Sequence, residues 1–180
     1  NVAGIRAFRD AFPALPQIAC FDTAFHADLP EVASRFALLR ALHDDGVRRY
    51  GFHGLSYQYI MGTLQRHLPR ARGRVLMAHL GNGASLCAAV DGRSQATTMG
   101  FSALDGLMMG SRCGALDPGI VLHLWRQGWS VEQVERLLYK ESGLLGVSGR
   151  SADMRTLRHA AAEGDNQAQL AIDLFGYRLR

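Results

Sequence analysis

Two glycines around an asparagine, Gly81-Asn82-Gly83, are the residues best suited to hold an anion. They separate two apolar runs that predict strands, so they form a bend between strands. Glycine lets a ligand come close to the backbone, and successive free N–H groups in such a bend form an anion-binding concavity. The spacing therefore predicts a phosphate-binding loop.

Three further side chains stand where a ligand could reach them. Asp22 follows residues 17–21, a predicted strand, and open α/β sheets bind ligands at the carboxyl ends of their strands. His53 lies in a loop bracketed by glycines, and Arg112 lies in a long glycine-rich connection. Such connections within a domain are usually functional or disordered, and the apolar Leu107-Met108-Met109 argues against disorder. Each of these side chains is a candidate for contact with a bound anion.

The elements that must position these residues predict an α/β chain. Residues 75–80, 85–90 and 93–98 predict a meander of three antiparallel strands, and Asp91-Gly92 favours a type I′ turn between the last two.

A helix is expected on each side of this meander. The earlier one follows Gly54, with Ser56 as a possible cap, and ends before Pro69. The half after the meander is mostly helical, with one helix beginning at Ser151 or Asp153.

The pattern excludes two common phosphate loops. A Walker A loop needs Gly-Lys-Ser/Thr, but the single lysine, Lys140, follows Tyr139. A dinucleotide fingerprint needs glycine where Leu86 stands, and it opens a helix rather than a strand. A strand–glycine loop–strand hairpin is instead typical of the actin-like and sugar-kinase superfamily, whose hairpins hold ATP phosphates by backbone N–H groups.

Composition narrows the class further. The chain has 180 residues, 48% of them hydrophobic, which is enough for a buried core. Its net charge of +4 invites a nucleic-acid interpretation, but the densest basic cluster, residues 66–74, has no interleaved aromatic side chains. We interpret that cluster as a solvated connector and expect no nucleic-acid partner.

The cysteines and the apolar runs indicate which cellular compartment to expect. Three cysteines lie far apart without a CxxC pair, which favours a reduced cytoplasmic protein over a disulfide scaffold or a zinc site. No apolar run approaches the roughly 20 residues of a membrane span, so no membrane partner is expected.

Seven motifs in order resemble one enzyme family. They are FDTAFH (21–26), YGFHG (50–54), HLGNGASL (79–86), MGF with GLMMGSRCG (99–114), LDPG (116–119), SGLLGVSG (142–149) and S-x-D-M-R (151–155). Together they closely resemble acetate kinase and its relatives, propionate and butyrate kinase, over essentially the whole chain.

The resemblance implies an architecture. The chain would be the central fragment of such a kinase, with an incomplete actin-like/sugar-kinase (ribonuclease H-like) ATPase fold. Residues 1–24 would end the first lobe, and residues 25–180 would form the first half of the second, nucleotide-binding lobe. The full-length kinase would be a homodimer.

The resemblance also implies roles for individual residues. The catalytic residues would be Asp22, His53 and Arg112; the ATP or ADP phosphates would contact His79, Gly81, Asn82 and Gly83; Asp153 and Arg155 would hold the nucleoside; and Phe52 and Ala103 would line the acyl pocket. Mg²⁺ would meet Asp22, directly or indirectly, with its main ligands outside the chain. Without the resemblance, an Asx turn at Asp22, a hydrogen-bonded loop histidine at His53 and charge pairing at a helix start would each be ordinary structural readings.

The implied activity is transfer of the ATP γ-phosphoryl group to acetate or a similar short carboxylate, giving acetyl phosphate and ADP. The fragment alone is expected to be inactive, and the alternative is a non-catalytic nucleotide-binding module. Two departures from the family pattern stand out: Ala103 replaces a proline of the acyl pocket, and Leu55-Ser56-Tyr57 replaces Thr-Ser-His. Ala103 suggests a wider pocket that tolerates propionate.

Overall fold

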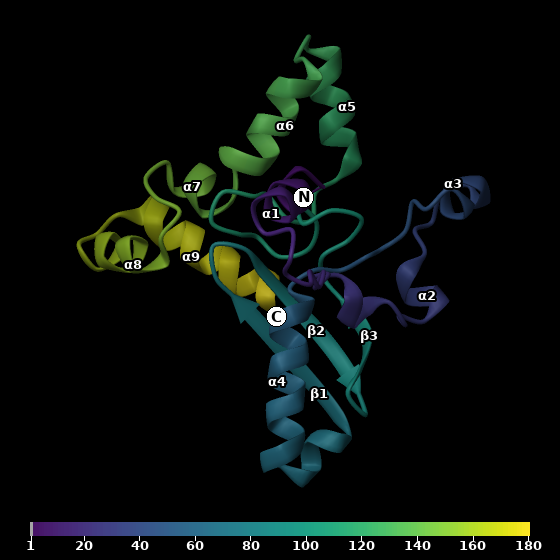
Figure 1. Ribbon diagram of the computed structural model, residues 1–180. Coiled ribbons are helices and arrows are strands. Elements are labelled where there is room, and N and C mark those ends of the chain that lie inside the picture. Colours follow the sequence, from purple (N-terminus) through teal and green to yellow (C-terminus); the bar gives the residue numbers. More distant parts are fainter. Residues whose placement is uncertain (1) are drawn as a thin grey trace.

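A three-stranded antiparallel sheet lies at the centre of the chain, and helices surround it (Figure 1). The computed structural model describes residues 2–180. The elements in chain order are α1 (Val2–Ala11), η1 (Ala24–His26), α2 (Glu31–Ser34), α3 (Arg40–Asp44), α4 (Gly54–His67), η2 (Pro69–Arg72), β1 (Arg74–Leu80), β2 (Ala84–Val90), β3 (Arg93–Thr97), α5 (Pro118–Arg126), α6 (Val131–Lys140), α7 (Gly143–Ser148), α8 (Met154–Ala162) and α9 (Asn166–Leu179).

The predicted meander is confirmed. The strands follow the order β1-β2-β3, and Met77 pairs with Cys87 at the middle of the first ladder. Asp91 and Gly92 take φ angles of 51° and 82°, the positive values that a type I′ turn requires. A register shift between Ala88 and Ala89 interrupts the second ladder.

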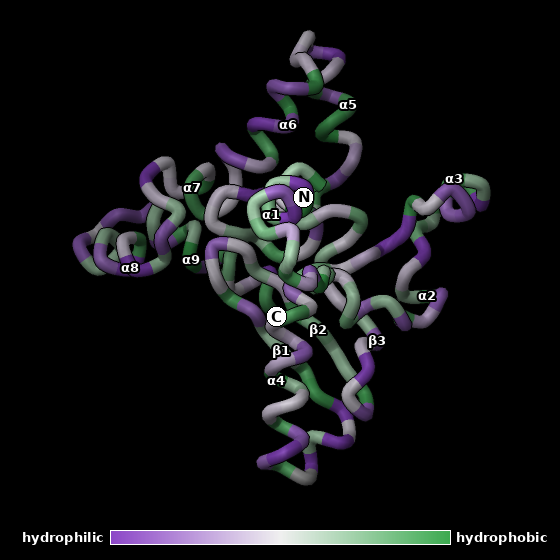
Figure 2. Tube along the Cα trace, in the orientation of Figure 1, coloured by the Kyte–Doolittle hydropathy of each residue, from purple (hydrophilic) through white to green (hydrophobic). Residues whose placement is uncertain are grey.

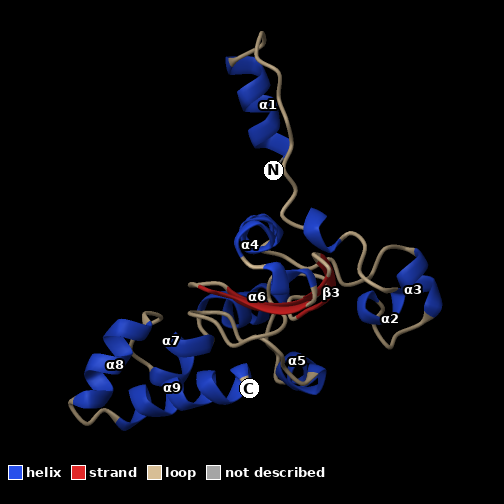
Figure 3. Cartoon of the chain, turned by 90° about the horizontal axis from the view of Figure 1, so that it is seen from below, coloured by secondary structure: helices blue, strands red, loops and turns tan. Residues whose placement is uncertain are grey.

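Helix α4 covers one face of this sheet. Tyr57 and Met61 of α4 are buried against Met77, Cys87 and Ala89 of the strands. These strand residues alternate along the chain, so they point to the same face. Figure 3 shows the sheet edge-on with α4 along one side. The packing fixes the start of α4 beside the loop between β1 and β2.

The long connection between β3 and α5 is buried although it contains neither helix nor strand. Met99, Leu107 and Met109 are at most 4% exposed and form a second cluster with Ala84 at the start of β2. Phe175 of α9 packs against the same cluster. The apolar side chains therefore hold this glycine-rich connection in place over the sheet.

The helical half has a core of its own. Leu144, Leu157 and Ala171 belong to one buried cluster that joins α7, α8 and α9. The side chains of Asp153 and Asp165 cap α8 and α9 by accepting backbone N–H groups of their first turns.

Helices α5 and α6 form a projecting hairpin. Ser130 and Gln133 make a reciprocal capping box at the start of α6. Figure 2 shows hydrophobic residues along α5, although none of its residues is buried. None of the helices that the structure describes is both long and apolar enough to cross a membrane.

Two local predictions are wrong. Residues 17–21 form no strand: Ile18 is 87% exposed, and the sheet strands in the described part of the chain pair only with one another. A lone extended segment gains no ladder hydrogen bonds, so its apolar composition cannot make it a strand. Ser56 does not cap α4, because that helix begins at Gly54 after His53.

Candidate functional site

The Gly81–Gly83 loop joins β1 to β2 and is tied to the buried connection. The last pair of the ladder is Leu80 with Ala84, and the Gly81 N–H donates to the Gly83 carbonyl at 3.0 Å. The carbonyl of Asn82 accepts the Gly110 N–H at 3.0 Å. The predicted phosphate loop is thus a tight bend held against the residues that precede Arg112.

The side chains of His53 and Arg112 converge on this loop. A Cβ atom placed on Gly83 would lie 2.9 Å from Arg112 Nη2 and 3.2 Å from His53 Nε2. A larger residue at position 83 would therefore displace one of them. The structure brings together a backbone bend, a guanidinium and an imidazole, which are groups that bind phosphoryl oxygens.

His53 is held in an uncommon backbone conformation. Its φ of 58° is left-handed, and its N–H donates to Asp22 Oδ2 at 2.7 Å. The other oxygen, Asp22 Oδ1, accepts the Leu55 N–H at 3.4 Å. Asp22 thereby satisfies N–H groups at the beginning of α4, the role that a capping side chain usually has.

The ring of His53 is enclosed on several sides. Its Nδ1 lies 2.8 Å from Ser85 Oγ, and its ring stacks on His79 with centroids 3.9 Å apart. Burial lowers the pKa of His53, and His79 and Arg112 lower it further, while Asp22 acts against them. The neutral ring is therefore favoured, which leaves one N–H to donate.

Arg112 is anchored by the neighbouring loop. Its Nη1 donates to the Ala103 carbonyl at 2.6 Å, while Nη2 faces Gly83. One side of the guanidinium is thus fixed by protein and the other is turned towards the glycine loop. His79 is fixed in turn by a 3.0 Å contact between its Nδ1 and Ser56 Oγ.

A cavity of about 510 Å³ extends from the glycine loop to the start of α8. Gly81 and Asn82 line one end, and Ala152 and Asp153 line another. Gly110 lies between them, where a Cβ would collide with the side-chain oxygen of Asn82. The structure therefore places Asp153 on the same cavity as the Gly81–Gly83 loop.

Asp153 and Arg155 differ in their surroundings. Asp153 caps α8, and hydrogen bonds from the Thr156 side chain and backbone and from the Arg155 N–H lower its pKa. The Arg155 side chain is 94% exposed, with its Nε 3.7 Å from Asp153 Oδ1, and Arg155 does not line the cavity. The structure thus brings Asp153 to the site and leaves Arg155 at its outer edge.

Phe52 and Ala103 pack against one buried cluster. Both are half-buried on the group formed by Ala84, Met99 and Leu107. They come from different loops, one before α4 and one after β3. The fold thus brings together the two residues expected to line an acyl pocket.

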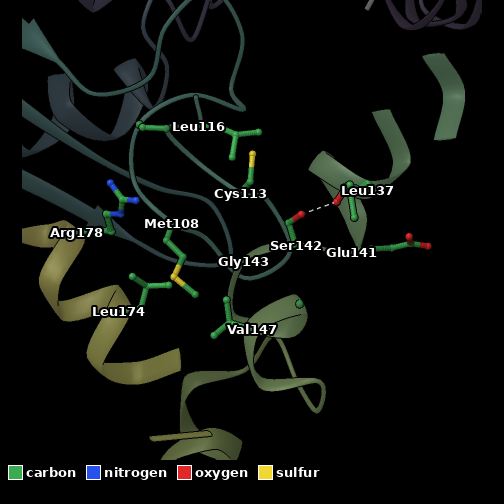
Figure 4. A pocket seen from close by; sticks show the side chains of 13 residues that line it. Met108, Cys113, Leu116, Leu137, Glu141, Ser142, Gly143, Val147, Leu174 and Arg178 are labelled. Carbon is green, nitrogen blue, oxygen red and sulfur yellow. Dashed lines mark hydrogen bonds between the residues drawn. The ribbon is translucent and has the colours of Figure 1, made fainter. Parts of the chain in front are cut away.

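A second cavity, of about 360 Å³, lies along the same connection (Figure 4). Met108, Cys113 and Leu174 line it, with Arg178 from the end of α9. Burial raises the pKa of the Cys113 thiol, so this cysteine is a weak nucleophile. None of the predicted site residues lines this cavity.

The described residues do not form a magnesium site by themselves. Within residues 2–180, no group of three or more acidic, histidine or cysteine side chains is arranged to hold a metal ion. Both oxygens of Asp22 already accept backbone N–H groups.

Sequence reasoning missed three buried polar residues around His53. Ser85 contacts its ring, Tyr57 contacts Ser85, and His26 reaches the neighbouring carbonyl of Phe52 with Nε2 at 3.0 Å. The sequence signal that could have revealed Ser85 is the alternation of side chains along a strand. Ser85 pairs with His79 across β1 and β2, so both side chains point to the face that α4 covers.

Comparison with solved structures places this fold in one class. The propionate kinase of Francisella tularensis superposes with a TM-score of 0.94 at 44% identity, over 99% of this chain and 47% of that chain. The acetate kinase of Porphyromonas gingivalis gives a TM-score of 0.91 at 38% identity, over 99% and 46%. The architecture is thus the α/β ATPase fold of carboxylate kinases, present here in part.

Sequence comparison agrees with the structural one. The acetate kinase of Rhodopseudomonas palustris is 61% identical over 182 residues, which cover 99% of this chain and 45% of that protein. The family model for the Acetokinase family matches residues 1–180, and the chain belongs to that family. It spans a little under half the length of the curated relatives that it matches.

Proposed function

We propose that this chain supplies the phosphoryl-transfer half of an ATP:acetate phosphotransferase. The observation that carries the proposal is the convergence of Arg112 Nη2 and His53 Nε2 over Gly83. These groups surround the place where a γ-phosphoryl group would lie if the β- and γ-phosphates bound the Gly81–Gly83 loop. Family membership supports the same assignment.

The reaction needs little acid–base chemistry. A carboxylate oxygen attacks the γ-phosphorus, the bond from phosphorus to the β,γ-bridging oxygen breaks, and ADP leaves with the electron pair. A carboxylate is already nucleophilic at neutral pH, so catalysis consists of positioning and charge stabilisation. Arg112 would stabilise the phosphoryl group in transfer, and the neutral His53 would donate a hydrogen bond to it.

The cavity supports the position proposed for the nucleotide. It runs from the phosphate loop to Asp153, so a nucleotide with its phosphates on Gly81 and Asn82 would direct its nucleoside towards α8. A volume of about 510 Å³ lies within the usual range for small-ligand pockets, roughly 300–1,000 Å³. Mg²⁺ is expected with ATP and is commonly held largely by the phosphates and water.

A coupled ADP-release assay with acetate, run beside ADP calorimetry on the protein at its natural length, tests the proposal. We expect both binding and turnover. Binding without turnover would instead favour the nucleotide-binding module, an alternative motivated by the chain's span of 45% of its acetate kinase relative. Absence of both would contradict the two assignments together.

A further inference from the structure

Two hydroxyl groups lie behind His53, on the side away from Gly83, and neither is exposed. Tyr57 and Ser85 are both 0% exposed. The Tyr57 hydroxyl is hydrogen-bonded to Ser85 Oγ, which lies 2.8 Å from His53 Nδ1. Position 57 is also one at which the sequence departs from the family pattern. The arrangement is a short chain of polar groups that ends at His53.

The direction of these hydrogen bonds follows from the number of protons available. Ser85 has one proton and Tyr57 has one, whereas His53 Nδ1 either donates or accepts. Among the described residues, Ser85 is the only side chain that offers the Tyr57 proton an acceptor. A buried donor without an acceptor is costly, so Tyr57 donates to Ser85.

The surroundings of the phenol agree with this direction. Burial raises the pKa of Tyr57, and its hydrogen bond to Ser85 and the backbone N–H of His79 act against the rise. A backbone N–H can only donate, so it provides no acceptor for the phenol proton. Ser85 Oγ could also accept a proton from His53 Nδ1, but its own proton would then have no acceptor among the described side chains, so Ser85 donates to His53 Nδ1. That nitrogen must then be unprotonated.

The opposite ring nitrogen faces the glycine loop. His53 Nε2 would lie 3.2 Å from a Cβ on Gly83, beside Arg112 Nη2. With Nδ1 accepting, Nε2 carries the ring proton. Two donors then point to one place, which suits an anion with several oxygen acceptors.

We propose that Tyr57 and Ser85 form an ordered hydrogen-bond relay that holds neutral His53 as the Nε2–H tautomer, aimed at a phosphoryl oxygen over Gly83. The inference deepens the proposed function and rests on it for the identity of the anion. Tyr57 and Ser85 are positioning residues in this account, because they act through His53.

Other charged and titratable groups also face the ring. Asp22 accepts the backbone N–H of His53, and His79 stacks on the ring. Arg112 faces it from the connection after β3, and His26 from η1. None of these is hydrogen-bonded to Nδ1, whose partner among the described residues is Ser85. The tautomer is therefore set at Ser85, although the other groups influence the charge of the ring.

Nitrogen NMR of the histidine rings tests the relay without any substrate. The protein at its natural length is labelled with ¹⁵N-histidine, and His53 is assigned by the signal that disappears in His53→Gln. At a pH where the ring is neutral, we expect the proton on Nε2. In Ser85→Ala and Tyr57→Phe, we expect the Nδ1–H form to appear alongside it.

Kinetics with acetate and ATP give a second readout. Each variant removes a hydroxyl and adds no atom, so we expect kcat to fall about 3- to 10-fold with KM for ATP nearly unchanged, the effect of one misdirected hydrogen bond. The control is Tyr59→Phe, which alters a 72% exposed tyrosine of the same helix. This control should change neither the ring signals nor kcat.

The double variant Tyr57→Phe/Ser85→Ala separates proton ordering from stability. Ser85→Ala leaves the buried Tyr57 hydroxyl without an acceptor, and the double variant removes that hydroxyl, so we expect its Tm to recover relative to Ser85→Ala. The mixed tautomer and the reduced kcat should remain. Recovery of kcat together with Tm would show a purely structural role and overturn the relay.

Two NMR results would also overturn the relay: a wild-type ring proton on Nδ1, or ring signals unchanged in both single variants. The proposed function fails on different grounds, namely absence of phosphoryl transfer in a protein whose His53 carries the Nε2 proton.

Discussion

At the scale of single residues, each side chain that faces the glycine loop is also held in place by a hydrogen bond to another part of the protein. Arg112 is anchored on the Ala103 carbonyl, and His53 is held by Asp22 and Ser85. Preorganised groups of this kind lower a barrier because they need not reorient as charge develops. Changes at the anchoring residues should therefore affect activity as well as stability.

Asp22→Ala is the most direct of these changes. It removes the acceptor for the N–H groups of His53 and Leu55 at the start of α4. Loss of a helix cap typically costs about 1 kcal/mol, and we expect a reduction of that size in the free energy of unfolding. Denaturant unfolding measures it, and Asp28→Ala, which alters an exposed residue of the same region, is the control. An unchanged midpoint for Asp22→Ala would contradict the capping role.

Ala103→Pro tests the acyl pocket at the same scale. Ala103 packs on the cluster that also holds Phe52, so added atoms there should narrow the space beside it. The Ala103 carbonyl that anchors Arg112 remains in proline. We expect kcat/KM for propionate to fall relative to that for acetate, by about 10-fold for the loss of space for one methylene. An unchanged ratio would show that this position does not select the acyl chain.

At the scale of elements, local signals predicted those parts of the fold that depend on neighbouring residues. The meander with its Asp91-Gly92 turn and the helix start at Asp153 follow from short patterns, and both are confirmed. Residues 17–21 failed because a strand needs a partner, which the pattern of a single segment does not contain. Ser56 failed as a cap because a distant residue, Asp22, takes the N–H groups there.

The same limit applies to the candidate site. Glycine spacing and motif order indicated Gly81–Gly83, His53 and Arg112, and the fold brings these together. Tyr57 and Ser85 were missed because their contact depends on how α4 packs on β2. Such contacts come from tertiary packing, and neither residue type is distinctive alone.

His26 provides an element-scale prediction for pH. It is 1% exposed, with Nδ1 2.8 Å from Ser94 Oγ and Nε2 3.0 Å from the Phe52 carbonyl, and so joins η1 to β3 and to the loop before α4. Burial lowers its pKa from 6.5, although the Phe52 hydrogen bond and Asp22 act against this. The folded state thus binds its proton less tightly than the unfolded state does.

Acidification should destabilise the folded state through His26. Stability from neutral His26 is fully present above the unfolded pKa of 6.5 and is lost as pH falls through the lower folded pKa. We expect Tm to fall on acidification below about pH 6.5, and to fall less steeply in His26→Gln than in the wild type. Thermal unfolding between pH 5 and pH 8, the range in which histidine ordinarily titrates, measures both slopes. Parallel slopes would assign the acid sensitivity to other groups.

At the scale of the whole molecule, one sheet supports the two ends of a single site. The β1–β2 loop carries the proposed phosphate-binding bend, α4 brings His53 to it from one face, and the buried connection brings Arg112 from another direction. The α7–α9 group closes the cavity at Asp153. Figures 1 and 3 show these segments, far apart in sequence, gathered around the sheet.

Arg112→Ala tests the central claim most directly, in the protein at its natural length. An arginine that stabilises a phosphoryl group in transfer is worth about 10³ to 10⁵ in kcat, and we expect a loss in that range with ADP affinity changed less than about 10-fold. Arg158→Ala, at an exposed position on α8, should retain wild-type kcat. A fall in kcat of less than about 10-fold in Arg112→Ala would contradict the account, because Arg112 would then be an ordinary loop residue beside the glycine bend.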